Sequence, residues 1–332
     1  MTAAVWTDPR FPGVSCRRVG PEALETLLSL RSRLDRDYLA EVLPDWLEDR
    51  PGGVYAYYYE DRLCGLCSIH IPRPGEAWLR GKRIALGFEG KGIGTATAVF
   101  ELEEARRLGA RVARLITEVG NAAVHRMMRE KLGFEDLGRW WVAESLAPGE
   151  LAPAPGVQAD PPAARVPATV LQPADFAPGT LPSTVAVLEP LLARHAAAAG
   201  GAADGPGRGR WGLWATLADR YTLAGFGTEE LAEAVRTGSV LAVSGPPGAP
   251  DGLALVSPAG AGGGLLLRLF VATHAAAAAV LRSWLRSRNA PNLAVSLPAA
   301  QAAALLGVSP DALAGRGGTL FVLYQRELDG SR

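Results

Sequence analysis

A glycine-rich loop places the strongest constraint on what this chain can fold into. Gly90, Gly92 and Gly94 stand at alternate positions between an apolar run that ends near Leu86 and a helix-like segment that begins at Thr95. Glycines spaced so closely remove the Cβ atoms that keep an anion away from the backbone, and the following helix N-terminus adds favourable charge. The loop therefore predicts either an anion site between a strand and a helix, or a plain tight turn between them.

Two common phosphate-binding loops do not fit this stretch. The dinucleotide fingerprint needs G-x-G-x-x-G, whereas these glycines follow G-x-G-x-G and Thr95 comes next. A Walker loop needs a glycine where this chain has Leu86, and it needs Ser or Thr directly after the lysine, whereas Lys91 is followed by Gly92. The sequence thus excludes both the Rossmann and the P-loop reading.

The elements around the loop repeat in the second half of the chain. The 332 residues are about right for two domains, and a hydrophobic content of 48% provides a core for each. Hydrophobic periodicity predicts hairpin, strand, helix, strand, helix and strand over residues 52–146, and the same order from residue 239 onward. Residues 146–168 are dominated by Pro and Ala, so we expect a linker without regular structure. The predicted domains are therefore 1–145 and 169–332.

Charge and cysteine content exclude several classes of protein. The 34 basic and 34 acidic residues balance, which leaves no broad footprint for nucleic acid or an anionic membrane. The sequence contains no apolar stretch of the ~18 residues that a spanning helix needs, and its start does not have the pattern of a signal peptide. Cys16, Cys64 and Cys67 are too few for a disulfide framework in a chain of this length. We expect a cytoplasmic protein.

Cys64 and Cys67 have C-x-x-C spacing, which raises the question of a metal site. They lie in a predicted strand, where residues three apart point to opposite faces and cannot share a metal comfortably. The chain has no second such pair. We therefore expect no bound metal.

The loop and its surroundings resemble the GNAT superfamily of acyl-CoA N-acyltransferases. That family commonly has [Q/R]-x-x-G-x-[G/A] between a strand and a helix, and Gly90 and Gly92 match its glycines. The stretch ARRLGARVARLITEVGNAAVHRMMREKLGF, residues 105–134, looks like the helix, strand and helix that follow in the family. The resemblance covers residues 14–145, and the layout of the whole chain is similar to proteins grouped with histidine N-acetyltransferase.

The resemblance implies an α/β fold with two tandem GNAT-like domains, each a mixed, mostly antiparallel sheet flanked by helices, the second one degenerate. It also implies that acetyl-CoA binds the first domain as a co-substrate. Three strand residues would pair with the pantetheine arm, the loop amides would hold the diphosphate, and a residue at the head of the later helix would reach the arm. The implied binding residues are Ile84, Ala85, Leu86, Glu89, Gly90, Lys91, Gly92, Ile93, Gly94, Thr95 and Asn121.

The loop departs from the family pattern in its charges. Gly87 stands where the family has Gln or Arg, and Glu89 stands directly before Gly90, where an Arg is frequent in relatives. A carboxylate near a diphosphate is repulsive unless it turns away or pairs with a cation such as Lys91 or Arg83. The loop therefore predicts either weaker CoA binding or a Glu89 side chain that faces outward.

The later helix departs from the family in its acid. The family often places a tyrosine there, which protonates the leaving thiolate, and the resemblance puts Met128 or Arg129 at that position. The spacing from Asn121 to Gly133 is one residue longer than usual. A thiol with a pKa of ~8.5 is a fair leaving group, so an acid can be dispensable.

A general base must take the proton of an ammonium nucleophile. Glu76 is the one carboxylate on the strand before the loop, with a turn residue after Pro74 and Gly75 as its alternative role. His70 is the second candidate because imidazole titrates in a suitable range, although a lone histidine on a strand is often structural. The predicted catalytic residues are therefore Glu76 and His70.

Two functions follow from these residues, and a third alternative, a structural or interaction protein without a ligand, requires that Glu89 block the loop amides. The first is an N-acetyltransferase that moves an acetyl group from acetyl-CoA to the amine of a small molecule or an amino acid by direct attack. The second is a non-catalytic module that binds acyl-CoA or another ligand. In either case we expect a small-molecule partner, no nucleic acid, no membrane, and a monomer or homodimer.

Overall fold

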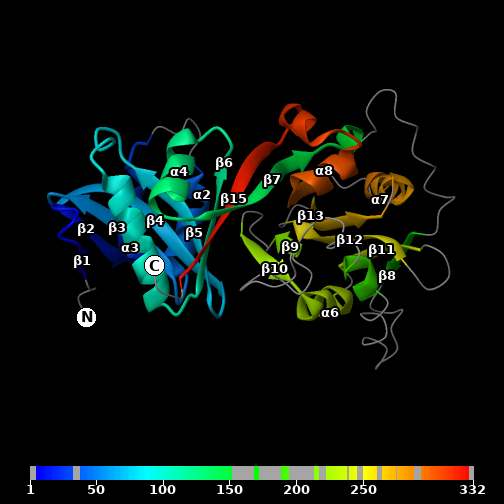
Figure 1. The fold of residues 1–332 in the computed structure, drawn as a ribbon, viewed down its shortest axis with the longest axis horizontal. Coiled ribbons are helices and arrows are strands. Elements are labelled where there is room, and N and C mark those ends of the chain that lie inside the picture. Colours follow the sequence, from blue (N-terminus) through cyan, green and yellow to red (C-terminus); the bar gives the residue numbers. More distant parts are fainter. Residues whose placement is uncertain are drawn as a thin grey trace. The chain divides into compact units, whose positions relative to one another are not determined.

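The computed structural model describes residues 5–32, 38–151, 168–171, 188–193, 213–216, 222–237, 239–244, 250–259, 264–273, 275–287 and 293–328. The chain divides into two compact units: residues 1–137 with 323–332, and residues 138–322 (Figure 1). Among the described helices, none has the length and apolar character needed to cross a membrane.

The first unit is built on a mostly antiparallel sheet with the order β1-β2-β3-β4-β5-β6-β15. Neighbours from β1 to β5 are antiparallel, and β5 and β6 are parallel. The strands are β1 (Val5–Thr7), β2 (Val14–Val19), β3 (Gly53–Tyr59), β4 (Arg62–Arg73), β5 (Glu76–Ile84), β6 (Val112–Glu118) and β15 (Thr319–Glu327).

Helices cover both faces of this sheet. Side chains alternate along β3, so Val54 and Ala56 pack in one buried cluster with α1 (Leu24–Leu28) and α2 (Leu39–Glu48). Tyr55 and Tyr57 point the other way and contact Phe100 of α3 (Ile93–Arg107), with ring centroids 5.2 and 6.5 Å apart. The strand β6 is followed by α4 (Ala122–Arg126) and a π-helical turn, η2 (Met127–Lys131).

The second unit has the sheet order β7-β14-β13-β12-β11-β8, and β13 and β14 are parallel as β5 and β6 are. Its strands are β7 (Glu135–Leu146), β8 (Ala168–Leu171), β11 (Val240–Ser244), β12 (Pro250–Ala259), β13 (Gly264–Ala272) and β14 (Leu293–Pro298). A separate pair is formed by β9 (Leu213–Thr216) and β10 (Leu223–Phe226), and the helices are α6 (Thr228–Arg236), α7 (Ala275–Ser287) and α8 (Ala299–Leu306).

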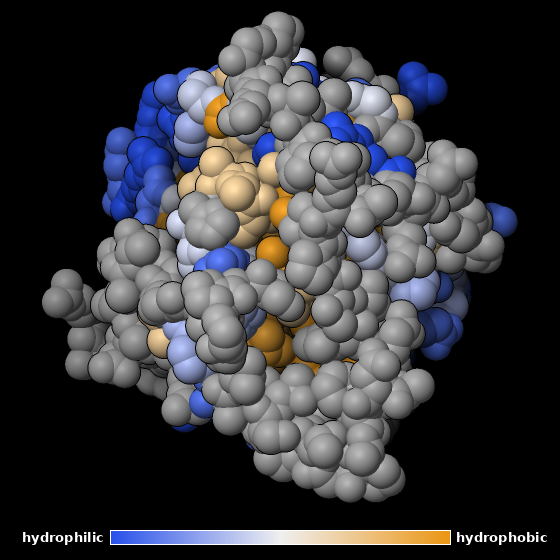
Figure 2. Space-filling view, turned by 90° about the vertical axis from the view of Figure 1, so that its right-hand side faces the viewer, coloured by the Kyte–Doolittle hydropathy of each residue, from blue (hydrophilic) through white to orange (hydrophobic). Residues whose placement is uncertain are grey.

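Apolar residues are buried on both faces of the second sheet. Leu241 and Val243 of β11 belong to a cluster with α7 and α8, whereas Val240 and Ala242 belong to a cluster with α6 and the helical segment 188–193. In the space-filling view, described apolar residues (orange) gather toward the middle and hydrophilic residues (blue) toward the margins (Figure 2). The predicted fold class, an α/β fold with a mostly antiparallel sheet flanked by helices, is confirmed.

The compact units end at other residues than the predicted domains. β7 follows the last helix of the first unit, yet its residues from Trp140 to Leu146 pair with β14 in the second unit. The final residues of β15, which the sequence analysis gave to the second domain, belong to the first unit. The predicted linker begins with a short 3-10 helix, η3 (Pro148–Leu151), whose Leu151 is buried in the second core; residues 152–167 lie outside the described residues.

Candidate active site

A cleft opens where two parallel strands diverge. Pairing between β5 and β6 covers only Glu76–Trp78 opposite Val112–Arg114. Beyond these pairs the strands border a cleft of about 460 Å³, which residues 79–84 of β5 and 115–117 of β6 line together. Among the described residues, the inner edges of both strands have no strand partner beyond this point, so the gap can accept an extended ligand.

A β-bulge shapes the cleft edge of β5. Between one matched pair and the next, β4 advances two residues, Leu66 to Ser68, while β5 spans three, Arg80 to Arg83. The extra residue lies at Gly81, whose φ of +67° is in the left-handed region that favours glycine. The bulge turns the side chains on either side of it in different directions.

The bulge therefore connects the cleft to both faces of the sheet. Arg80 and Lys82 both line the cleft. Arg80 lies over the ring of Trp46 on α2, 4.4 Å from its centroid. The Nζ of Lys82 donates to Oε2 of Glu101 on α3, at 3.0 Å. Side chains two residues apart in a regular strand share a face, so these opposite contacts follow from the extra residue.

The glycine loop after β5 presents a row of open amides. In this part of the described chain, the N–H groups of Gly90–Gly94 have no hydrogen-bond acceptor, whereas the Thr95 N–H donates to the Gly92 carbonyl at 3.0 Å. Gly90 and Gly92 have φ values of +76° and +77°. A Cβ built on any of the three loop glycines meets no atom within 4 Å. Open N–H groups at the N-terminus of α3 suit a diphosphate.

Ile84, Ala85 and Leu86, the residues predicted to bind the pantetheine arm, differ in the hydrogen bonds of their backbone. The Ala85 N–H donates to the Cys64 carbonyl of β4 at 2.8 Å. Because neighbouring residues of an antiparallel strand use opposite edges, the backbone groups of Ile84 face the cleft. The Leu86 N–H donates to the Arg31 carbonyl at 2.8 Å. Of the three, Ile84 is the residue whose backbone groups face the cleft.

Glu89 folds back onto the start of the loop. Its Oε2 accepts from the Gly87 N–H at 2.8 Å, and the residue lines the cleft. The carboxylate thus binds an amide outside the open row Gly90–Gly94. Lys91 does not neutralise it directly, since its Nζ lies over the ring of Tyr59, 5.1 Å from the centroid. We call the row of open amides at Gly90–Gly94 the cradle. Glu89 leaves these amides unoccupied, and its carboxylate lies at the edge of the cradle.

Asn121 caps α4 at the edge of the cleft, which it lines. Its Oδ1 accepts from the Val124 N–H at 3.3 Å, and its Nδ2 lies 3.3 Å from Oγ1 of Thr117 on β6. Capping satisfies an N–H of the first turn and fixes the amide side chain. The structure thus brings Asn121 to the same cleft as Ile84.

The π-helical turn η2 accounts for the extra residue before Gly133. The Leu132 N–H bonds to the Met127 carbonyl, five residues earlier, at 3.1 Å. Met128 is buried and lines the cleft, whereas Arg129 reaches Oδ2 of Asp136 at 2.5 Å outside it. Of the two residues that the sequence left open for the tyrosine position, Met128 is the one in the cleft.

The structure does not bring Glu76 to the cleft. Glu76 is the first residue of β5, at the opposite end from the loop, and its Oε2 accepts from Nη1 of the buried Arg114 at 2.8 Å. The Nε of Arg114 donates to Oε1 of Gln325 on β15 at 2.9 Å. Glu76 is therefore held in a buried pair that ties β5, β6 and β15 together.

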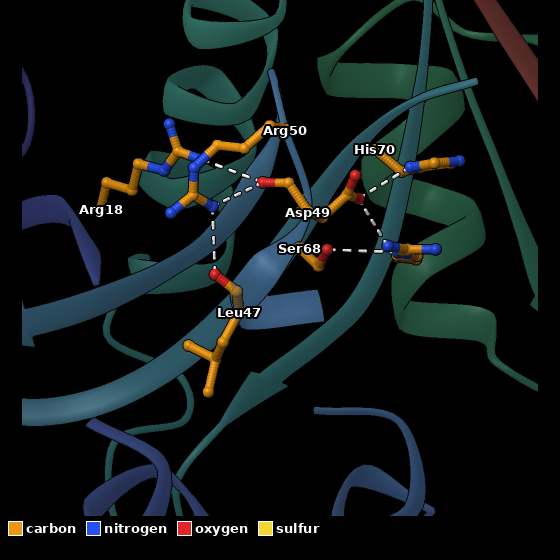
Figure 3. A network of polar contacts seen from close by, with 7 residues as sticks. Arg18, Leu47, Asp49, Arg50, Ser68 and His70 are labelled. Carbon is orange, nitrogen blue, oxygen red and sulfur yellow. Dashed lines mark hydrogen bonds and ion pairs between the residues drawn. The ribbon is translucent and has the colours of Figure 1, made fainter. Parts of the chain in front are cut away.

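His70 lies in a polar network with Asp49 (Figure 3). Arg80 belongs to the same network and lines the cleft. The Nδ1 of His70 is 2.7 Å from Oδ2 of Asp49, which also accepts from Nη2 of Arg80 at 2.8 Å. The Nε of Arg80 donates to Oγ of Ser68 at 3.2 Å. Burial alone would raise the pKa of Asp49, but the hydrogen bond to His70 and the charges of His70, Arg80 and Arg18 hold it below its usual value.

Lys82 and Glu101 form an ion pair in the cleft that the sequence analysis missed. Glu101 is almost fully buried and accepts from the Tyr57 hydroxyl at 2.6 Å as well as from Lys82. The available signal was a charge within the otherwise apolar run Val99–Leu102 of the helix. The sequence did not show toward which face of the sheet the Lys82 side chain points, because the bulge reverses the alternation of side chains along β5.

Comparisons with known proteins find one family match and several similar solved structures. Residues 22–134 match the model of the acetyltransferase (GNAT) family. A GCN5-related N-acetyltransferase from Sphaerobacter thermophilus is 15% identical over 97% of this chain and 98% of its own, with a TM-score of 0.56. A putative acetyltransferase from Pyrococcus horikoshii is 16% identical over 97% and 92%, with a TM-score of 0.47. A Bacillus subtilis acetyltransferase solved in complex with CoA is 20% identical over 38% and 78%, with a TM-score of 0.32.

No curated protein matches this chain. The likeness to the Sphaerobacter structure shows a shared fold along nearly the whole chain. The cleft and the glycine loop both lie within residues 22–134, and this part of the chain matches the acetyltransferase (GNAT) family.

Proposed function

We propose that the chain is an N-acyltransferase that transfers an acetyl group from acetyl-CoA directly to the amine of a small molecule or an amino acid. The observation that carries this proposal is the open row of amides at Gly90–Gly94, next to a cleft that reaches both faces of the sheet. A diphosphate at the amides and an arm in the cleft leave the α2 face for the acceptor. A cytoplasmic location and a small-molecule amine partner are parts of the same proposal.

The main chain supplies most of the binding in this scheme. The loop amides and the α3 dipole would hold the diphosphate, and the free edge of Ile84 would pair with the arm as an added strand does. The neutral amine attacks the thioester carbonyl carbon, the new C–N bond forms, and the C–S bond breaks to release the thiolate. Backbone N–H groups along β5 would stabilise the charge that develops on the carbonyl oxygen.

The acceptor must lose a proton before it attacks. Glu76 is held by Arg114 away from the cleft, so it cannot take this proton without leaving its partner. His70 lies on the α2 face beside Asp49, which in turn accepts from Arg80 at the cleft. Because a guanidinium does not relay a proton, His70 would act on an amine that enters from the α2 face. His70 is therefore the better placed of the two predicted bases.

A non-catalytic acyl-CoA-binding module is the second candidate. Two observations favour it: the carboxylate of Glu89 at the rim of the cradle, and Met128 in the cleft where the family often has a tyrosine. Such a module would bind the same ligand through the same amides but would not turn it over.

Calorimetry and thiol release separate these functions. We expect acetyl-CoA to bind the full chain and to release thiol with a subset of a panel of amino acids, amines and polyamines. Binding of acetyl-CoA without turnover of any amine in the panel would favour the non-catalytic acyl-CoA-binding module. The absence of heat and of a thermal shift at millimolar acetyl-CoA would reject both functions.

A matched pair of variants tests the cradle itself. Gly94 lies in the first turn of α3 with open space around its Cβ position, so Gly94→Asp and Gly94→Asn should both fold, and the aspartate favours the helix N-terminus. The added carboxylate of Gly94→Asp would oppose a diphosphate, and we expect affinity for acetyl-CoA to fall by about tenfold or more relative to Gly94→Asn. Equal affinities would show that the ligand's charge lies elsewhere.

A further inference from the structure

The cleft contains a part-buried ion pair, Lys82 and Glu101, that the proposed function leaves without a role. Lys82 and Glu101 both line the cleft, and their Nζ and Oε2 are 3.0 Å apart. The Lys82 side chain is 22% exposed to solvent, whereas the Glu101 side chain is 4% exposed. The ammonium is thus the member of the pair that a ligand in the cleft can meet.

A similar network one turn along α3 shows what a structural pair looks like in this unit. Glu104 accepts from the Tyr55 hydroxyl at 2.7 Å and from Nη2 of Arg107 at 2.6 Å, as Glu101 accepts from Tyr57 and Lys82. Arg107 is 66% exposed on its own helix, and neither it nor Glu104 is among the residues that line the cleft. The tie between α3 and β3 therefore exists without Lys82.

Burial of a charge pair needs a reason other than stability. The cost of removing two charges from water often equals or exceeds their attraction, so a hydrophobic pair of similar size would hold α3 on β5 at least as well. Ionisable groups that are buried and line a cleft are candidates for function. The position of Lys82 along the cleft indicates which function.

Lys82 lies on the path that the arm of acyl-CoA would take. A ligand whose diphosphate sits at Gly90–Gly94 must run back along β5, where it passes Ile84 first and Lys82 next. The thioester is at the far end of the arm from the diphosphate. The Lys82 ammonium therefore borders the part of the cleft where the C–S bond would break.

We propose that Lys82 is the catalytic residue that meets the leaving sulfur, and that Glu101 is the positioning residue that holds its ammonium in the cleft. The inference rests on the proposed function. As the C–S bond breaks, its electron pair stays on sulfur, where the Lys82 ammonium stabilises the negative charge of the thiolate. The nitrogen of the new amide loses one proton to solvent, and the departing thiolate takes one proton from solvent, so the protons balance. Lys82 would thus stabilise the leaving thiolate, which Met128, at the position of the family's tyrosine, cannot do.

Lys82 is the cation that meets Glu101, and two further cations, Arg80 and Arg83, line the same cleft. Glu101 of α3 and Tyr57 of β3 face the Lys82 ammonium. The thiols of Cys16 on β2 and Cys67 on β4 are close enough to interact with its charge. Burial raises the pKa of Tyr57 and of both thiols well above their usual values, so these three stay neutral. Glu101 is the negative group that counters the ammonium.

The first test measures the ionisation of bound CoA and needs no turnover. The thiolate of CoA absorbs in the ultraviolet, so its fraction can be titrated in the complex with the full chain. We expect the bound thiol to have a pKa about one unit lower in the wild type than in Lys82→Met, which is a tenfold difference in the thiolate-to-thiol ratio below that pKa. Lys82→Arg keeps the charge and should resemble the wild type. Arg107→Met removes an equal charge outside the cleft and should leave the thiol pKa unchanged.

The outcomes separate the two proposals. If CoA does not bind the wild type, the proposed function and the role of Lys82 both fail. If CoA binds and its thiol pKa is the same in the wild type and in Lys82→Met, the role of Lys82 fails while the proposed function stands. Should Lys82→Met lose its melting transition, Lys82→Gln supplies the same neutral comparison.

The second test concerns Glu101 and uses turnover. We expect Glu101→Gln to lower kcat about tenfold or more at unchanged KM for acetyl-CoA, since one positioned group that stabilises developing charge contributes on the order of 10²-fold. Glu104→Gln is the matched control on the same helix and should leave kcat unchanged. Equal kcat values for both variants and the wild type would overturn the positioning role.

Discussion

Single residues decide whether the cradle accepts a diphosphate. The open amides of Gly90–Gly94 come from the glycines, but the charge at their rim comes from Glu89. A hydrogen bond to the Gly87 amide fixes that carboxylate outside the row of amides, so it opposes an anion through charge rather than by filling the site. Such repulsion between partly exposed charges is modest and sensitive to salt.

Replacement of Glu89 tests whether its carboxylate opposes the diphosphate through its charge rather than by occupying the binding site. We expect Glu89→Gln to raise the affinity for acetyl-CoA about threefold to tenfold at low salt, with a smaller gain at higher salt, as screening predicts. Calorimetry at two ionic strengths measures the effect. Acetylpantetheine lacks the diphosphate and should bind both proteins equally. A loss of affinity in Glu89→Gln would show that the bond to Gly87 is needed to shape the loop.

At the scale of the element, the bulge in β5 joins the fold to the site. It adds one residue at Gly81, and this turns Arg80 toward α2 and Lys82 toward α3. The same residue is enclosed, since a Cβ on Gly81 would lie 2.3 Å from the Trp46 ring. Glycine is thus required twice, by the left-handed φ and by the close approach of α2.

A substitution at Gly81 should therefore affect both stability and binding. We expect Gly81→Ala to lower the free energy of unfolding by about 2–4 kcal/mol, from strain at positive φ and from the clash with Trp46. Urea denaturation measures this. The double variant with Trp46→Ala relieves the clash but not the strain, so its cost should be smaller than the sum of the two single costs. Additive costs would mean that α2 moves aside without penalty.

At the scale of the whole molecule, the last strand of the chain completes the first unit. Arg114 of β6 donates to Gln325, the Tyr324 hydroxyl is 2.9 Å from Nδ1 of His125, and the Leu328 N–H donates to the Arg111 carbonyl at 2.7 Å. β7 has the corresponding place beside β14 in the second unit. Each unit is thus closed by a strand that is distant in sequence from most of its sheet.

Removal of this strand should destabilise the first unit. We expect a chain that ends at Val322 to lose at least about 2 kcal/mol of stability in that unit, because Arg114 and His125 each lose a hydrogen-bond partner. Faster hydrogen exchange of the β6 amides measures the loss. A synthetic peptide of residues 319–328 should restore protection, and the same peptide with Tyr324→Ala and Gln325→Ala should not. Unchanged exchange after truncation would show that β6 needs no partner on that side.

Local sequence predicted most of the elements in the first unit. The helix that follows the loop, the cap at Asn121 and the turn at Glu60–Asp61 are set by residues close together in the chain. The open amides belong to this class as well, because three nearby glycines are enough to expose them. Such features depend on periodicity and backbone freedom, which a single sequence shows.

Features that depend on distant contacts were not predictable in this way. Nothing near Glu76 in the sequence indicates that Arg114 and Gln325 surround it, and the sequence alone did not show that Lys82 faces Glu101. One extra residue in a strand reverses every later side chain, and hydrophobic alternation does not show where that residue is inserted.

The sequence by itself determined that this chain has a strand, a glycine loop and a helix in succession, and hence a row of open amides between them, because φ/ψ preferences and missing Cβ atoms act locally. Only the tertiary structure decided which side chains reach the cleft and which strand closes each unit. Those outcomes depend on packing between segments far apart in the chain, where burial and shape rather than local preference select the arrangement.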